Sequence, residues 1–238
     1  MLFRALIVET LKLRRSLALL LVISAPVLVA LICVLIGLHD KRSMPLDRYA
    51  DTGAAFWAFA MLPLTVTALS VLMAQMEHGP RTWDHLLALP GARRWLFLAK
   101  AAVMMALVAA MTLWLYALLI GGAAFVGKIH AVSGTLDAAQ LRVTLAKMTA
   151  ASLLMCVIQL WTALRFRSFV PPLVLGILGT FVSVAAASAR EGAYFPWLMP
   201  LHILSTETGM QRMALLIGAW GGLLALALML ADLAQREA

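Results

Sequence analysis

The chain is 238 residues long, and 63% of its residues are hydrophobic while 13% are charged. A soluble domain is about half apolar and about one quarter charged, so this composition excludes a water-soluble enzyme and a disordered chain. The formal net charge of +8 comes from short basic clusters between apolar runs, a pattern typical of membrane loops that requires no nucleic-acid partner.

Residues 1–16 are predicted to form an amphipathic helix that lies in the headgroup layer without crossing the bilayer. At the helical period one arc is apolar and the opposite arc is charged, although Val8 and Leu11 fall on the charged side. The apolar arc contains Leu2, Phe3, Leu6, Ile7 and Leu13, and the charged arc contains Arg4, Glu9, Lys12 and Arg15. The alternative is a basic flank that only orients the segment after it.

Six apolar runs follow, each near or above the roughly 20 residues that a helix needs to cross a bilayer. The run at 96–126 is longer than required, so we expect it either to tilt or to break near Gly121 and Gly122. The sequence therefore predicts an all-α integral membrane protein whose six transmembrane helices form one domain at residues 17–238. The predicted spans are residues 17–38, 53–76, 96–126, 148–164, 169–189 and 213–233.

The centres of these runs contain no charged residue, whereas ion-coupled transporters and intramembrane proteases place ionisable groups there. If the protein moves a substrate, its energy is therefore expected to come from outside the membrane part. The mildly polar side chains within the runs are expected to form hydrogen bonds between helices. They are Thr65, Thr67, Ser70, Thr112, Ser152, Gln159, Thr180 and Ser183.

Between the second and third spans, residues 80–90 predict a short helix at the membrane surface. Pro80 suits the first turn of a helix and Pro90 prevents its continuation, which leaves about 15 Å of helix between them. Because this element is joined directly to two spans, it is suited to pass a push from a cytoplasmic partner into the membrane.

Basic residues lie next to the span ends on one side of the membrane, at Arg14, Arg15, Arg93, Arg94 and Arg165. Cytoplasmic loops carry an excess of Lys and Arg close to transmembrane ends. Both termini and the 80–90 helix are therefore predicted to be cytoplasmic.

Other motifs are sparse. The histidines have no metal-ligand spacing, no phosphate-binding loop occurs, and Cys33 and Cys156 are expected to be buried free thiols. Gly218 and Gly222 are spaced for close approach of the last helix to a neighbour, either within the subunit or between subunits.

Three segments of the chain form recognisable motifs. The first segment is Glu9-x-x-Lys12-x-Arg14-Arg15-Ser16. The second and most specific is Glu77 followed by Arg81-Thr82-Trp83-x-x-Leu86-Leu87-x-x-Pro90, then Arg93, Arg94 and Lys100. The third is Phe195-Pro196-Trp197-x-x-Pro200, between the fifth and sixth spans. Together these segments resemble the permease subunit of type 2 ABC exporters, of the small six-helix kind that works with a separate ATP-binding subunit.

The resemblance implies that the short helix is a coupling helix that fits a cleft on the ATPase. The contact candidates are Glu77, Arg81, Thr82, Trp83, Asp84 and Leu86. The N-terminal helix would frame the same contact with Glu9, Lys12, Arg14 and Arg15. Residues 194–200 would form a partly re-entrant external hairpin, and their aromatic side chains also suit the outer membrane interface.

The resemblance further implies two permeases, as a homodimer or a pair of related subunits, with two ATPase subunits in a bacterial inner membrane. ATP and Mg²⁺ would bind the ATPase, so this chain would need no cofactor or metal and would not itself be an enzyme. An uncharged interior favours a hydrophobic or amphipathic cargo, such as a drug, a peptide antibiotic or a lipid.

Three alternatives remain open for the function. The chain could be a permease that serves maturation of an extracytoplasmic metalloenzyme, or an assembly factor that transports nothing. A membrane enzyme with a site at the interface would need groups such as His39, Asp40, Asp47 and Asp51.

Overall fold

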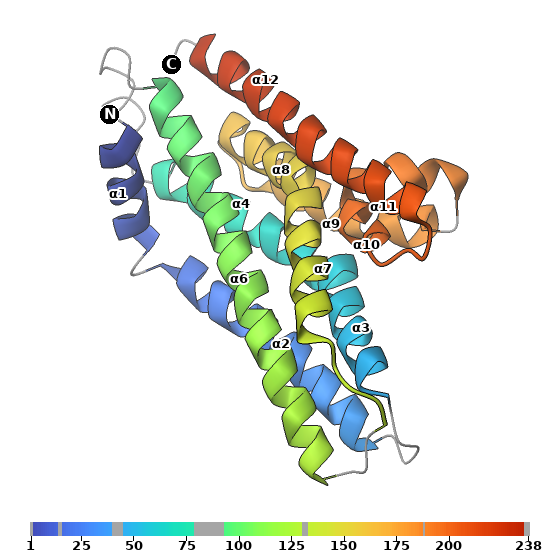
Figure 1. Cartoon of the computed structure of the whole chain (residues 1–238). Helices are drawn as coiled ribbons and strands as arrows, with labels where there is room; N and C mark the ends of the chain where they lie inside the picture. The colour runs from blue at the N-terminus through green and yellow to red at the C-terminus, as the bar shows by residue number, and fades with distance from the viewer. Residues whose placement is uncertain are drawn as a thin grey trace.

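The computed structural model describes residues 2–13, 16–39, 45–78, 93–129, 133–187 and 189–235. These residues form a bundle of long helices without a strand, which confirms the all-α membrane class (Figure 1). The elements are α1 (Leu2–Leu13), α2 (Leu17–His39), α3 (Leu46–Phe56), η1 (Trp57–Met61), α4 (Leu62–His78), α6 (Arg93–Ile129), α7 (Ala138–Ala151), α8 (Leu153–Arg165), α9 (Val170–Ala186), η2 (Arg190–Tyr194), η3 (Pro196–Leu198), α10 (Met199–His202), α11 (Thr208–Leu215), η4 (Leu216–Gly221) and α12 (Gly222–Gln235).

Five of the described helices are long and apolar enough to cross a membrane, and α9 is a sixth, shorter apolar helix of 17 residues. The five are α2, the continuous α3–η1–α4, α6, α7–α8 and α11–η4–α12. These five helices overlap five of the six predicted runs, and α9 overlaps the run predicted at residues 169–189. α6 is continuous through Gly121 and Gly122, so the alternative of a break there is wrong.

Two helices begin well before the apolar runs that predicted them, because a helix can extend past the apolar part of its sequence. α3 begins at Leu46 and α7 begins at Ala138. Just before α7, the Asp137 side chain accepts a hydrogen bond from the backbone N–H of Gln140. This N-cap satisfies one of the amides that a helix start leaves without a partner. Hydropathy alone cannot detect such polar first turns.

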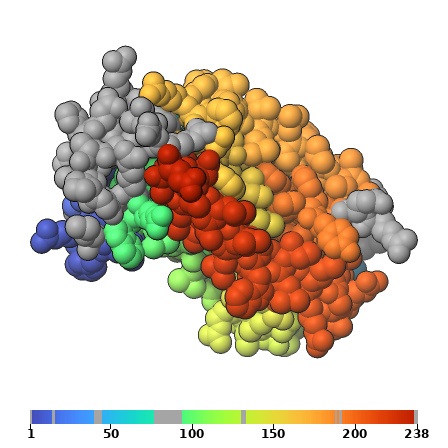
Figure 2. Space-filling view, turned by 90° about the horizontal axis from the view of Figure 1, so that it is seen from above, coloured from blue at the N-terminus to red at the C-terminus, as the bar shows by residue number. Residues whose placement is uncertain are grey.

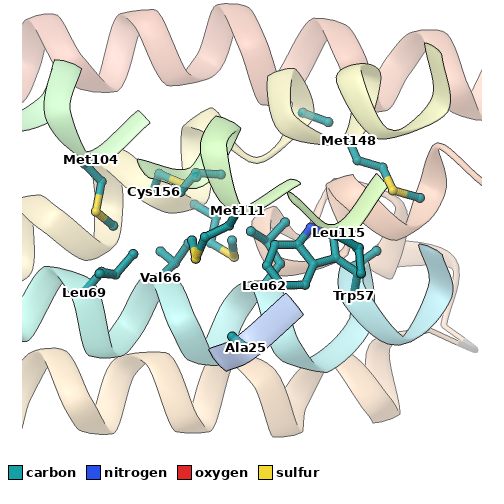
Figure 3. Packing of buried hydrophobic residues seen from close by; sticks show 14 of the residues in the cluster. Ala25, Trp57, Leu62, Val66, Leu69, Met104, Met111, Leu115, Met148 and Cys156 are labelled. Atoms are coloured by element: carbon teal, nitrogen blue, oxygen red, sulfur yellow. The ribbon is translucent and has the colours of Figure 1, made fainter. Parts of the chain in front are cut away.

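The interior of the bundle is filled by large apolar side chains from α4, α6 and α8, with sulfur-containing residues among them (Figure 3). Cys33 and Cys156 are buried free thiols, as expected. The outward faces of α2, α9 and α12 are also apolar, which suits helices surrounded by lipid or by another apolar surface. Labelled core residues include Trp57, Leu62, Val66, Leu69, Met104, Met111, Leu115, Met148 and Cys156.

The Gly218 and Gly222 pair packs inside the subunit, against the junction of α7 and α8. A Cβ atom on Gly218 would clash with the backbone of Ala151, and one on Gly222 would lie 2.6 Å from Leu153 Cγ. The two glycines therefore let the last helix approach α8 at backbone distance, which decides between the two expected uses of this spacing.

Most of the mildly polar side chains in the spans are buried but bond within their own helices, so the expectation of bonds between helices is wrong for them. Thr67, for example, donates to the Pro63 carbonyl 2.8 Å away, four residues earlier on α4. Serine and threonine hydroxyls reach such carbonyls easily, so they need no partner on a neighbouring helix. The same holds for Thr65, Ser70, Thr112, Ser152, Thr180 and Ser183. Gln159 is the exception, because its amide donates from α8 to the Pro172 carbonyl on α9 at 2.5 Å.

Candidate functional site

One end of the bundle, called here the terminal end, contains α1, the last turns of α4, α8 and α12, and the first turns of α6 (Figure 1). Figure 2 looks onto the molecule from above, with α1, the start of α6 and α12 at the surface. α4 leads into residues 79–92 and α6 follows them, so this end flanks the predicted coupling segment.

A buried ion pair joins α1 to α6 at the terminal end. The Nζ atom of Lys100 donates to Oε2 of Glu9 at 2.6 Å, although the two residues are 91 positions apart. Lys12, one turn further along α1, donates to the other carboxylate oxygen of Glu9 at 3.0 Å. One carboxylate therefore contacts two ammonium groups.

Both members of the Glu9–Lys100 pair are removed from solvent, with Glu9 3% exposed and Lys100 0% exposed. Burying a charge costs several kcal/mol, and a partner at hydrogen-bond distance offsets this cost. Removing one partner would leave the other charge buried. The pair therefore holds α1 against the first turns of α6 in one arrangement.

The ion pair also sets which face of α1 points outward, and here the predicted arcs are wrong. Glu9 and Leu13 are buried, whereas Phe3 and Ile7, assigned to the same apolar arc as Leu13, are exposed. Because Lys100 requires a counter-ion, α1 turns Glu9 inward. Leu11 and Val8, which the predicted arcs placed on the charged side of the helix, are exposed together with Phe3 and Ile7.

A second polar contact at this end joins α8 to α12, and sequence reasoning missed it. Oδ2 of Asp232 accepts from Trp161 Nε1 at 2.8 Å and from Arg165 Nη1 at 2.5 Å. Asp232 is the only acidic residue in the apolar run at 213–233. A lone carboxylate in an apolar run needs a partner, and this signal could have indicated the contact.

Most of the predicted coupling residues lie outside the described residues. This applies to Arg81, Thr82, Trp83, Asp84 and Leu86, and also to Arg14 and Arg15. The backbone of Glu77 belongs to the last turn of α4, but its side chain is outside the described part. Of the predicted contact residues at this end, Glu9 and Lys12 are brought together, and they are joined by Lys100, which belongs to the second resembling segment but was not a predicted contact residue.

The predicted hairpin residues lie between α9 and α11, toward the other end of the bundle. Trp197 is 4% exposed and its ring lies against Gly179 of α9, where a Cβ atom would clash with it. Phe195 stacks on Trp197 with ring centroids 5.5 Å apart. Because its ring is buried against α9, Trp197 is a packing residue inside the protein rather than part of an exposed aromatic belt. Of the two prolines of this segment, Pro200 is buried and Pro196 is half-buried.

An apolar groove of about 400 Å³ lies between α2 and the η1–α4 region. Leu28 and Leu64 contribute to its walls, and the polar lining consists of Ser24 and Thr65. The Thr65 hydroxyl is already bonded to the Met61 carbonyl at 2.7 Å. The groove therefore presents no charge to a molecule inside it. Among the described residues, no cluster of three or more His, Cys, Asp or Glu side chains could hold a metal ion.

The sequence from residue 5 to residue 183, most of the chain, matches the ABC-2 family of transporter proteins. The chain belongs to this family. An ABC-2 protein of this kind is a membrane permease component of a transporter rather than a catalytic subunit. Among curated proteins, no relative matches the chain.

Proposed function

We propose that this ABC-2 protein is the permease subunit of an exporter whose ATP is hydrolysed by a separate partner. Two copies of the ATP-binding subunit would serve two permeases, a homodimer or two related chains, in a bacterial inner membrane. ATP and Mg²⁺ would bind the partner. Family membership supports a transporter permease, and the geometry of the terminal end supports the mode of coupling.

The observation that carries the proposal is the buried Glu9–Lys100 pair, 2.6 Å between charged atoms. α6 begins directly after residues 79–92, which contain all the coupling candidates except Glu77, and Lys100 lies two turns into this helix. A force on that segment would reach the first turns of α6, and the pair would transfer it to α1. Rigid-body movement of packed helices is the usual way in which such a push changes a cleft elsewhere.

The terminal end is proposed to face the cytoplasm, where the ATPase is. Its described cations include Arg4, Lys12, Arg94, Arg165 and Arg167, all close to helix ends. Positive charge in this position favours the cytoplasmic side. The exposed Phe3, Ile7 and Leu11 face of α1 would then rest in the inner headgroup layer.

The cargo is proposed to be hydrophobic or amphipathic, because the groove between α2 and η1–α4 carries no charged lining residue. An ion or a strongly charged solute entering it would lose hydration without gaining a partner. An apolar body loses little by the same transfer, so a drug, a peptide antibiotic or a lipid suits the groove.

Purification of the tagged chain from native membranes tests the proposal, and a soluble ATPase with a phosphate-binding loop is expected to co-purify. The double variant Glu77→Lys/Trp83→Ala should lose this subunit or its regulated ATPase activity. A matched control, Glu207→Lys/Trp220→Ala, makes the same exchanges at exposed positions away from the terminal end and should retain both. Full association and regulation in the first variant would overturn the coupling assignment.

A further inference from the structure

A second groove, between α6 and α7, has a different character from the one beside α2. Its volume is about 270 Å³. α6 contributes Ala109, Leu113 and Tyr116, and α7 contributes Arg142, Leu145 and Ala146. The lining is mainly apolar, but an arginine lies on one wall.

We propose that this groove binds one phospholipid, with an acyl chain between α6 and α7 and the phosphate on the Arg142 guanidinium. The proposal depends on the chain lying in a membrane and goes beyond any role in export.

The floor of the groove suits an acyl chain because small side chains leave the space and the threonine hydroxyls there already have partners. Ala109 and Ala146 face the space from the two helices. The hydroxyls of Thr112 and Thr149, which also line it, donate to the Val108 and Leu145 carbonyls at 2.9 and 3.0 Å. Apart from the Arg142 guanidinium and the Tyr116 hydroxyl the remaining surface is apolar, so a hydrocarbon chain between Ala109 and Ala146 breaks no hydrogen bond of the two threonines.

The position of Arg142 suits a phosphate. Arg142 is exposed and lies in the second turn of α7, whose apolar continuation into α8 extends into the bundle. Within the described part of the chain no ion pair engages its guanidinium, and Asp137, the acid nearest in sequence, accepts from the Gln140 amide. A guanidinium binds a phosphate through two parallel hydrogen bonds, which Lys cannot reproduce.

The pairing of an apolar slot with one cation at the polar start of a membrane helix decides the occupant. A soluble anion would use Arg142 but leave the slot empty, and an uncharged hydrocarbon would fill the slot but leave the cation unpaired. A phospholipid satisfies both. The guanidinium offers the phosphate a charge-assisted contact while the slot takes the acyl chain.

Native mass spectrometry of the purified full chain tests the proposal, with phosphatidylglycerol and diacylglycerol of the same acyl chains as probes. The wild type should retain phosphatidylglycerol in preference to diacylglycerol, because diacylglycerol lacks the phosphate. Arg142→Gln should lose about tenfold in retention of phosphatidylglycerol, the size expected for one charge-assisted contact, and with it the preference. Ala146→Leu should reduce retention of both lipids by filling the slot.

Two matched controls keep the test specific. Arg212→Gln removes an exposed arginine on α11, and Ala150→Leu enlarges an exposed alanine one turn beyond Ala146 outside the groove lining. Both should bind lipid like the wild type. Equal retention by all four variants would overturn the proposal. So would unchanged lipid binding with a lower dimer fraction in Ala146→Leu, because the groove would then be covered by a second copy of the chain.

Discussion

Lys100 of α6 donates a 2.6 Å hydrogen bond to the carboxylate of Glu9 on α1, and both side chains are shielded from solvent. The pair connects the N-terminal helix to the helix that follows residues 79–92. Since two buried charges at this distance are costly to separate, α1 and the start of α6 are expected to move together.

The first prediction concerns the stability that this pair provides. Lys100→Met should destabilise the protein by about 3 kcal/mol, the lower end of the range for breaking a buried pair, because Lys12 still contacts the carboxylate. The double variant Glu9→Leu/Lys100→Met should recover most of this loss, since both charges of the buried Glu9–Lys100 pair are then removed. Thermal unfolding followed with a thiol-reactive dye measures the effect, because Cys33 and Cys156 are buried until the chain unfolds.

Lys128→Met provides the control, since it removes an exposed cation at the other end of the same helix. It should leave the unfolding midpoint unchanged. If Lys100→Met unfolded at the same temperature as Lys128→Met, the pair would not contribute to stability.

The second prediction separates stability from coupling. The stable double variant Glu9→Leu/Lys100→Met lacks the ionic connection between α1 and α6, so the co-purified ATPase should bind but respond weakly to the permease. The measurement is the activity of the ATPase alone, with the wild-type permease and with the variant permease, the last two at the same subunit ratio. A full response in the double variant would show that apolar packing of α1 on α6 is sufficient.

The composition and the apolar runs were enough to predict the all-α membrane class and the positions of five long apolar helices and the shorter α9, because each run carries its own signal along the chain. The Glu9–Lys100 pair could not be predicted in this way, since the pairing depends on how α1 rotates on α6. Helical periodicity placed Glu9 among the outward charges, and a tertiary contact turned it inward. Similarly, the spacing of Gly218 and Gly222 indicated a close approach without specifying its partner, the junction of α7 and α8.

The third prediction follows from that close approach. Gly218→Ala should lower stability by about 1–3 kcal/mol, because the new methyl group would overlap the backbone of Ala151, which cannot move without shifting the helix. Gly221→Ala is the matched control, since its Cβ would lie 3.5 Å from the Leu154 side chain, an ordinary contact. Thermal unfolding compares the two variants. Equal stability would mean that the end of α7 and η4 separate easily at this point.

The fourth prediction tests the orientation of the chain. Cys33 and Cys156 are buried, so the folded native chain should not react with an impermeant maleimide, and single added cysteines can be read against it. Ser133→Cys lies at an exposed position in the connection between α6 and α7, away from the terminal end, and should be labelled in intact cells. Ala92→Cys, directly before α6, should be labelled only after the membrane is opened. The physical reason for this expectation is that basic residues lie next to the helix ends at the terminal end, and such residues favour the cytoplasmic side. Labelling of Ala92→Cys in intact cells, with protection of Ser133→Cys, would reverse the orientation and place the terminal end beyond the reach of a cytoplasmic ATPase.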